Sequence, residues 1–394
     1  MPVTAPSAPL AGAGTERDAR TWPVVALVLV FFLGVGATLP ALPGAVRATG
    51  AGGSALGLVL GVFPFAALAG RLIAGRATDR GGRVLTIRAG LLLTVVAGGL
   101  LALPATVAGL VVARVLHGLA DALVYTAASA WVLDRTPESR RPHALSVLGA
   151  GIWGGYALGP LVGVAVDVRA VGLVVVASGL IGLLLTARLP DRPALGEPLH
   201  GLRALLPRGV ALPGTALGLG NLGYAAMVGF LVVHLDDRGA RGALALTAFS
   251  VAVLFGRLVV VPLAAKVGIL RTLPYGLVAM AAGLLVIAGT GSTVVAAGAA
   301  VVVGLGYCLP FPALATLVAG RVEPAHRGAA IGALTAFYDV YVGVGSVIGG
   351  LVADRSGTPA VFVLAASGVL AAAAVNVALA RQDRRSRAVV GARP

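Results

Sequence analysis

The chain has 394 residues, 58% hydrophobic and only 11% charged, with a mean hydropathy of +0.97. Soluble domains are roughly 45–50% apolar and about 25% charged, so this composition excludes a water-soluble globular protein. A formal net charge of +15 would suggest nucleic-acid binding in a soluble chain, but here the arginines stand between apolar runs and indicate membrane topology instead.

Apolar runs of about 20 residues follow one another from end to end, each long enough to cross a hydrocarbon core of roughly 30 Å. They predict an all-α membrane protein with about twelve transmembrane helices. The expected spans are 22–44, 53–75, 84–103, 105–131, 144–166, 170–188, 210–234, 243–265, 271–290, 293–319, 328–353 and 358–380.

The basic residues predict how these spans are oriented. With the N-terminus inside, most of the 30 basic residues fall in cytoplasmic segments. The positive-inside rule therefore predicts a multi-pass protein of the cell (cytoplasmic) membrane with both termini in the cytoplasm. The basic residues expected outside are Arg47, Arg169, Arg238, Arg241 and Arg355.

A polar stretch after the second span contains Gly75, Asp79, Arg80, Gly82 and Arg83. Glycine lets two helices approach closely, an acid at a helix boundary caps a neighbouring helix N-terminus, and arginines hold a loop on the cytoplasmic side. The stretch predicts a gating loop that latches and releases. The alternative is that its arginines only set topology.

The fourth span carries Arg114, His117, Asp121 and Tyr125, which share a broad helix face. Ionised side chains inside a span are expensive in lipid, so Arg114 and Asp121 are expected to face a cavity and compensate one another. They are candidates for proton coupling. A static ion pair is the alternative, and His117 is interpreted either as a helix-contact residue or as a proton relay.

In the fifth span glycines recur every four residues, at Gly155, Gly159 and Gly163, and Pro160 stands among them. We call this pattern the glycine ladder. Small residues at this spacing let the backbone of a neighbouring helix approach closely, and the proline bends the helix. Helix packing alone is the competing explanation, because this glycine spacing is common in membranes.

One constant offset along the sequence, which we call the repeat offset, brings Gly70-Arg71-Leu72 onto Gly256-Arg257-Leu258. It also aligns Gly118 with Gly304 and Gly159 with Gly345. Two six-helix halves in the same orientation form a parallel repeat. The expected division is an N-tail at 1–21, halves at 22–188 and 210–380, a cytoplasmic linker at 189–209 and a C-tail at 381–394.

The eleventh span holds a second buried acid, Asp339, at a depth similar to that of Asp121. The repeat offset pairs Asp121 with Tyr307 and Asp339 with Trp153, so the two acids are not repeat-related.

Across nearly its whole length the chain resembles the major facilitator superfamily. The stretch with Gly75, Asp79, Arg80, Gly82 and Arg83 is similar to that family's signature after span 2. The resemblance implies a monomer, a loop that locks the outward-open form through Asp79, and neighbouring spans 2 and 11. That proximity makes Arg71 the expected partner of Asp339, with a snorkelling side chain as the alternative. Arg114 matches an arginine associated with proton coupling in the family.

The ladder from Gly155 to Gly163 resembles the antiporter signature of the twelve-helix drug:proton antiporter branch. The resemblance implies alternating access that exports a small organic molecule, a drug or natural product, against protons. Proton-coupling candidates are Asp121, Asp339, Arg114, His117 and Arg71. Pocket candidates, chosen because tyrosine is scarce and clustered, are Tyr125, Tyr156, Asn221, Tyr224, Tyr307 and Tyr338.

Three alternatives remain open. The same fold could carry a sugar, amino acid or other metabolite, it could work as a facilitator without protons, or it could be a receptor or scaffold that does not transport. An enzyme is disfavoured, because the sequence offers no nucleophile–base pair and no phosphate loop. The lone Cys308 excludes an internal disulfide, and neither a metal site nor a cofactor is expected.

Overall fold

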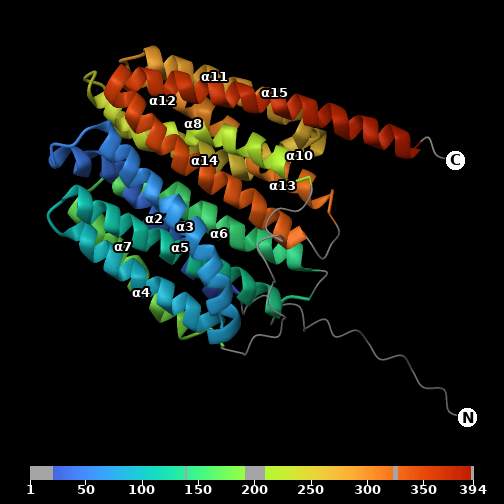
Figure 1. Cartoon of the computed structure of the whole chain (residues 1–394), viewed down its shortest axis with the longest axis horizontal. Coiled ribbons are helices and arrows are strands. Elements are labelled where there is room, and N and C mark those ends of the chain that lie inside the picture. Colours follow the sequence, from blue (N-terminus) through green and yellow to red (C-terminus); the bar gives the residue numbers. More distant parts are fainter. Residues whose placement is uncertain (1–20, 138–139, 191–208, 323–326, 392–394) are drawn as a thin grey trace, which may run out of the picture.

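The computed structural model describes residues 21–137, 140–190, 209–322 and 327–391. All regular structure in these ranges is helical (Figure 1). Twelve helical segments are long and apolar enough to cross a membrane, which confirms the predicted fold class. The N-tail up to residue 20 and most of the expected linker, 191–208, lie outside the described residues.

The first half contains six helices joined by short connections. These are α2 (Trp22–Ala48), α3 (Gly53–Gly81), α4 (Arg83–Ala102), α5 (Val107–Arg135), α6 (Arg141–Gly163) and α7 (Val168–Thr186).

Two of the six spans of the second half are interrupted. Its elements are α8 (Ala211–Asp236), α9 (Gly242–Phe255), a π-helical segment (Gly256–Val260), α10 (Val261–Val267), α11 (Ile269–Gly289), α12 (Thr293–Tyr307), α13 (Pro310–Ala319), α14 (Arg327–Ser356) and α15 (Thr358–Gly391). Span 8 consists of α9, the π-helical segment and α10 in succession. Span 10 divides before Pro310, which lacks the N–H that would continue the helical hydrogen bonds.

Two helix boundaries differ in detail from the sequence expectation. The stretch after span 2 is not a loop, because α3 runs on to Gly81 and α4 begins at Arg83. The whole turn is made by Gly82, whose φ of 90° is a conformation that favours glycine. At the other end of the chain, α15 continues into the expected C-tail and extends beyond the other helices (Figure 1).

The internal repeat is visible in side-chain packing. A Cβ at Gly118 would meet Ala66 Cβ at 2.9 Å, and one at Gly304 would meet Ala252 Cβ at the same 2.9 Å. Both pairs of positions are related by the repeat offset. Gly268, which turns between α10 and α11 with a φ of 100°, is likewise the equivalent of Gly82. The two halves therefore share a scaffold down to individual glycines.

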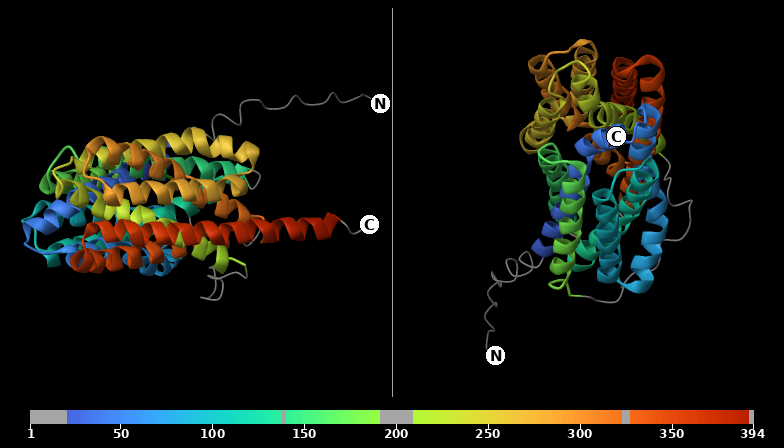
Figure 2. Two further views of the ribbon diagram at one scale, coloured as in Figure 1. Left: turned by 90° about the horizontal axis from the view of Figure 1, so that it is seen from above. Right: turned by 90° about the vertical axis from the view of Figure 1, so that its left-hand side faces the viewer.

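Seen end-on, the helices form two clusters, one from each half (right panel of Figure 2). α3 of the first half packs along α14 of the second, as the resemblance implied for spans 2 and 11. α2 meets α8, and α6 meets α9. The surface between the halves is thus built from helices α2, α3 and α6 on one side and α8, α9 and α14 on the other.

Candidate functional site

Two buried acids from opposite halves share one arginine. Arg71 on α3 donates from Nη2 to Asp339 Oδ2 at 2.7 Å and from Nε to the same oxygen at 3.1 Å. Asp121 Oδ2 on α5 lies 4.0 Å from Arg71 Nη2. Both acid side chains are 8% exposed, and that of Arg71 is 20% exposed. The expected contact between Arg71 and Asp339 is therefore present and links the two halves.

Arg114 and Asp121 form no direct ion pair among the described residues, although they interact electrostatically at longer range. Asp121 lies beside Arg71, whereas Arg114 donates from Nη1 to Thr38 Oγ1 at 3.1 Å. The guanidinium carbon of Arg114 lies 4.2 Å from the centre of the Phe63 ring, a cation–π distance. The two residues lie two turns apart on α5, and the fold brings a closer cation to Asp121 from α3.

His117 lies on α5 between aromatic rings. Its ring centroid is 5.8 Å from those of both Phe31 and Phe63, in edge-on geometry. Neither ring nitrogen has a hydrogen-bond partner among the described residues. A proton relay needs polar neighbours, so these surroundings favour the helix-contact interpretation of His117.

The gating stretch is only partly described. Asp79 and Arg80 belong to the last turns of α3, but their side chains lie outside the described part of the structure. Arg83 is buried and donates to Asp134 Oδ2 at 2.9 Å and to Thr78 O at 2.7 Å. These contacts pin the start of α4 to the end of α5. The latch role of the stretch stays a prediction.

The glycine ladder of α6 lies against α2. A Cβ at Gly155 would approach Leu29 O to 2.5 Å, and one at Gly159 would approach Leu33 O to the same distance. Gly163 faces Ala37 O, and Pro160 lies inside the helix. The ladder thus sets how closely α6 can pack on α2, next to the cavity between the halves.

A small cavity of about 20 Å³, room for roughly one water molecule, lies between the halves. Three pocket candidates, Tyr156, Tyr224 and Tyr307, line it. Tyr224 and Tyr307 stack with ring centroids 4.8 Å apart. The other lining residues are Leu39, Trp153, Ala157, Pro160, Val228, Phe249, Ser250 and Val253.

The remaining pocket candidates lie near the cavity without lining it. The Tyr338 hydroxyl is 3.3 Å from that of Tyr307. Tyr125 lies beside Arg71, whose guanidinium carbon is 5.3 Å from its ring centre. Asn221 donates to Leu217 O of its own helix at 2.7 Å and is not among the residues that line the cavity.

The sequence did not single out Trp153 or Arg257 for the site. Trp153 lines the cavity, and the guanidinium carbon of Arg257 lies 3.7 Å from the centre of its ring. The repeat offset was the signal available, because it relates Arg257 to Arg71 and Trp153 to Asp339. No group of three or more potential metal ligands occurs among the residues that the structure describes.

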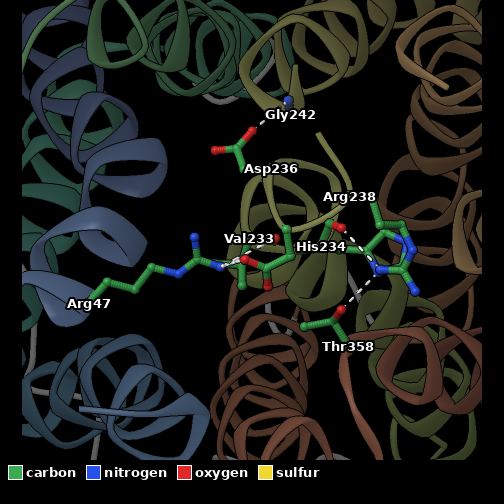
Figure 3. Close-up of polar contacts among 8 residues, drawn as sticks. Arg47, Val233, His234, Asp236, Arg238, Gly242 and Thr358 are labelled. Atoms are coloured by element: carbon green, nitrogen blue, oxygen red, sulfur yellow. Dashed lines mark hydrogen bonds and ion pairs between the residues drawn. The ribbon is translucent and has the colours of Figure 1, made fainter. Parts of the chain in front are cut away.

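The halves touch at the end where α2 stops and α3 begins, which we call the closed end. Arg47 donates to Asp237 Oδ1 at 2.6 Å and to Val233 O at 3.3 Å, and Figure 3 shows it reaching from α2 to the end of α8. Next to this pair, His234 Nδ1 lies 2.9 Å from Thr358 Oγ1, within hydrogen-bond distance (Figure 3).

A second contact at the closed end joins α14 to α3. Asp354 accepts hydrogen bonds from Gly53 N at 2.6 Å and from Ser54 N at 2.8 Å, which caps the N-terminus of α3. Along the same helix pair, a Cβ at Gly57 would lie 2.5 Å from Ser346 O. At the opposite end of α3, Gly75 has no such neighbour within 4 Å among the described residues. The described contacts between the halves are therefore close at the closed end, and Gly75 shows no equivalent close approach at the opposite end of α3.

Comparison with known proteins places this arrangement in a family. The family model described as "Major Facilitator Superfamily" matches residues 24–243 and 215–394. An "uncharacterized MFS-type transporter" of Burkholderia mallei is 30% identical over 379 residues, 92% of each chain. One of Pseudomonas aeruginosa is 30% identical over 392 residues, covering 94% of this chain and 96% of the relative.

Solved structures of low sequence identity share the fold. The nucleoside transporter NupG has a TM-score of 0.72 at 14% identity, with 91% of this chain and 98% of that chain covered. The human organic anion transporter MFSD10 (TETRAN) has a TM-score of 0.70 at 16% identity, with 91% and 99% covered. A bacterial homologue of the lysosomal transporter Spinster, solved inward-facing and unoccupied, has a TM-score of 0.69 at 16% identity, with 93% and 95% covered.

Proposed function

The chain belongs to the Major Facilitator Superfamily, and from that premise we propose that it is a proton-coupled exporter of a small organic molecule. The two halves rock about the cavity between them. A proton taken up at one side of the membrane drives the substrate to the other. The protein acts as a monomer in the cytoplasmic membrane.

The observation that carries this proposal is the sharing of Arg71 by Asp121 and Asp339. Arg71 and Asp121 belong to the first half and Asp339 to the second, so their contact has to change when the halves rock. A proton on Asp339 neutralises its carboxylate and releases the guanidinium to Asp121. Loss of the proton restores the link, and this exchange couples protonation to the movement of the halves.

Orientation and direction follow from the basic residues and from α6. With the termini in the cytoplasm, the closed end is the outer end and the cavity faces inward. The ladder Gly155, Gly159 and Gly163 supports export, because its spacing resembles that of antiporters. The latch formed by Asp354 at the outer end of α3 is the counterpart of the one proposed for Asp79 at the inner end.

The test is transport into inverted membrane vesicles with and without a proton gradient. The panel contains aromatic acids, cationic dyes and hydrophobic antibiotics. We expect at least one compound to accumulate only with the gradient. Asp121→Asn and Asp339→Asn should each lower that accumulation about tenfold or more, because each removes a charge-assisted interaction of roughly 1.5–3 kcal/mol.

The matched control is Asp167→Asn. Asp167 caps the N-terminus of α7 through Ala170 N, and asparagine caps helices equally well, so transport should be unchanged. Transport that persists without a gradient and in both acid variants would refute proton coupling. Failure of every panel compound would favour a narrow-specificity metabolite carrier over an exporter of drugs.

A further inference from the structure

The two halves place repeat-related arginines at equivalent points of the interface between them. Arg71 on α3 contacts Asp339 on α14. Arg257, in the π-helical segment of span 8, contacts Trp153 on α6. The repeat offset relates Arg257 to Arg71 and Trp153 to Asp339, so the two contacts are equivalent. The local packing is equivalent too. A Cβ at Gly70 would meet Ala122 Cβ at 2.8 Å, and one at Gly256 would meet Cys308 Sγ, at the equivalent position, at 2.8 Å.

The chemistry around the two arginines is different. Arg71 has two carboxylates beside it, whereas the positions equivalent to Asp339 and Asp121 around Arg257 are Trp153 and Tyr307. No hydrogen bond or ion pair to Arg257 is found among the described residues, and its Nε is buried without a partner. Stacking on Trp153 covers one face of the guanidinium and leaves its N–H edge unsatisfied.

The unsatisfied guanidinium adjoins the cavity. Trp153 and Tyr307 both line the cavity, and Val253, one turn before Arg257, lines it as well. Arg257 is partly buried and does not itself line the cavity; it adjoins the cavity through Trp153, on which it stacks. Aromatic rings surround the approach, since Trp153 lies 6.2 Å from Phe311 and 6.5 Å from Tyr338 between ring centroids.

The buried charges between the halves do not balance. Arg71, Arg114 and Arg257 contribute three positive charges, against one negative charge each from Asp121 and Asp339. A buried charge without a partner is unfavourable, so a single negative charge from a ligand would balance the set. Arg114 also has a buried Nε without a partner, but it donates to Thr38 Oγ1; Arg257 makes no hydrogen bond among the described residues, so the missing charge is assigned to it.

We propose that Arg257 is the anion-binding residue of the substrate site, and that the substrate is an aromatic organic acid whose carboxylate lies at its free N–H edge. The aromatic part of the substrate stacks among Trp153, Tyr224 and Tyr307, and its entry requires the halves to move apart and widen the cavity beyond the volume of about one water molecule that it has here. This proposal deepens the proposed function, because the bound acid is a substrate only if the protein is a transporter. Its binding is nevertheless measured separately from transport.

The experiment uses the full chain in lipid nanodiscs and three probes of one shape: 2-naphthoate, the neutral 2-naphthamide and the cationic 2-naphthylmethylamine. Binding is followed by the shift in unfolding temperature with probe concentration. We expect naphthoate to bind about tenfold or more tightly than either other probe. Arg257→Gln should abolish this preference, Arg257→Lys should retain part of it, and Arg271→Gln, an exposed arginine at the start of α11, should leave it unchanged.

Trp153→Asp is the second, independent variant. It installs the acid that the repeat equivalent of Trp153 carries, so Arg257 acquires an internal partner, as Arg71 has Asp339. We expect the variant to fold and to lose the preference for naphthoate. Equal binding of all three probes to the wild type, no naphthoate binding up to about 10 mM, or undiminished preference in Arg257→Gln or Trp153→Asp would each overturn the proposal.

Transport separates this proposal from the proposed function. If naphthoate binding requires Arg257 but no compound is transported into vesicles with a proton gradient, the anion site is supported and proton-coupled export is refuted. Gradient-driven export of cationic or neutral compounds that is unaffected by Arg257→Gln would do the reverse.

Discussion

Arg71 and Arg257 occupy equivalent places in a repeated scaffold and have opposite surroundings. Arg71 is 2.7 Å from Asp339, in an ion pair that links the halves and that Asp121 approaches to 4.0 Å. Arg257 lies 3.7 Å above the Trp153 ring, and no acid pairs with it among the described residues. One site is internally satisfied and suits coupling between the halves, while the other is left to bind something from outside.

This difference indicates that duplication of one half fixed the positions of the two arginines, and that later substitutions around them gave them different roles. Glycine contacts that hold the helices together are the same in both halves, as at Gly118 and Gly304. Around the two arginines the equivalent side chains have diverged, since Asp339 corresponds to Trp153 and Asp121 to Tyr307. Measurements on equivalent positions can therefore tell scaffold from function.

The largest expected difference is between Arg71→Gln and Arg257→Gln. Removing Arg71 leaves Asp121 and Asp339 buried together, which should lower the free energy of unfolding by about 3–5 kcal/mol. Removing Arg257 breaks no ion pair and loses only the stacking on Trp153, about 1 kcal/mol. Thermal unfolding in detergent, followed by far-ultraviolet circular dichroism, measures both.

A double variant, Arg71→Gln with Asp339→Asn, is the control for this pair. It removes one of the stranded carboxylates and should recover part of the stability lost by Arg71→Gln. Equal losses for Arg71→Gln and Arg257→Gln would contradict the view that only one of the two arginines is internally satisfied.

The next effect tests the shared scaffold. Gly304→Ala places a Cβ 2.7 Å from Phe249 O and Gly118→Ala places one still closer to Phe63 O, so each should destabilise by about 1–3 kcal/mol through overpacking, Gly118→Ala by the larger amount. Gly99→Ala and Gly298→Ala, where a Cβ meets no such neighbour within 4 Å, should be neutral or stabilising by up to about 1 kcal/mol. A large loss at only one of the first two would show that the halves pack differently.

The smallest expected effect lies at the second arginine site. Tyr307→Phe removes a hydroxyl that is 3.3 Å from the Tyr338 hydroxyl but keeps the stack on Tyr224, so it should cost about 1 kcal/mol. Tyr275→Phe, at a residue 79% exposed, should cost close to nothing in the same unfolding measurement. A Tyr307→Phe variant as stable as Tyr275→Phe would show that the hydroxyl pair contributes nothing.

Several features of the site were readable from residue type alone. Charges inside apolar runs are rare and expensive, so Arg71, Arg114, Asp121 and Asp339 stand out in the sequence as functional candidates. The contact between Arg71 and Asp339 followed from the expected proximity of spans 2 and 11. The sequence suggested Arg114 as the partner of Asp121 because both lie on one face of α5, and it did not show that Arg71 approaches Asp121 more closely from another helix.

The sequence by itself determined the membrane class, the twelve spans and the repeat, because burial in lipid demands long apolar helices and duplication leaves a constant offset. Only the tertiary structure decided which charges meet, that the stretch after span 2 turns on Gly82 alone, and that Arg257 lies over Trp153 without an acid. The reason is physical: hydropathy acts on each segment separately, whereas an ion pair or a cavity depends on side chains from several helices that meet only when the halves pack together.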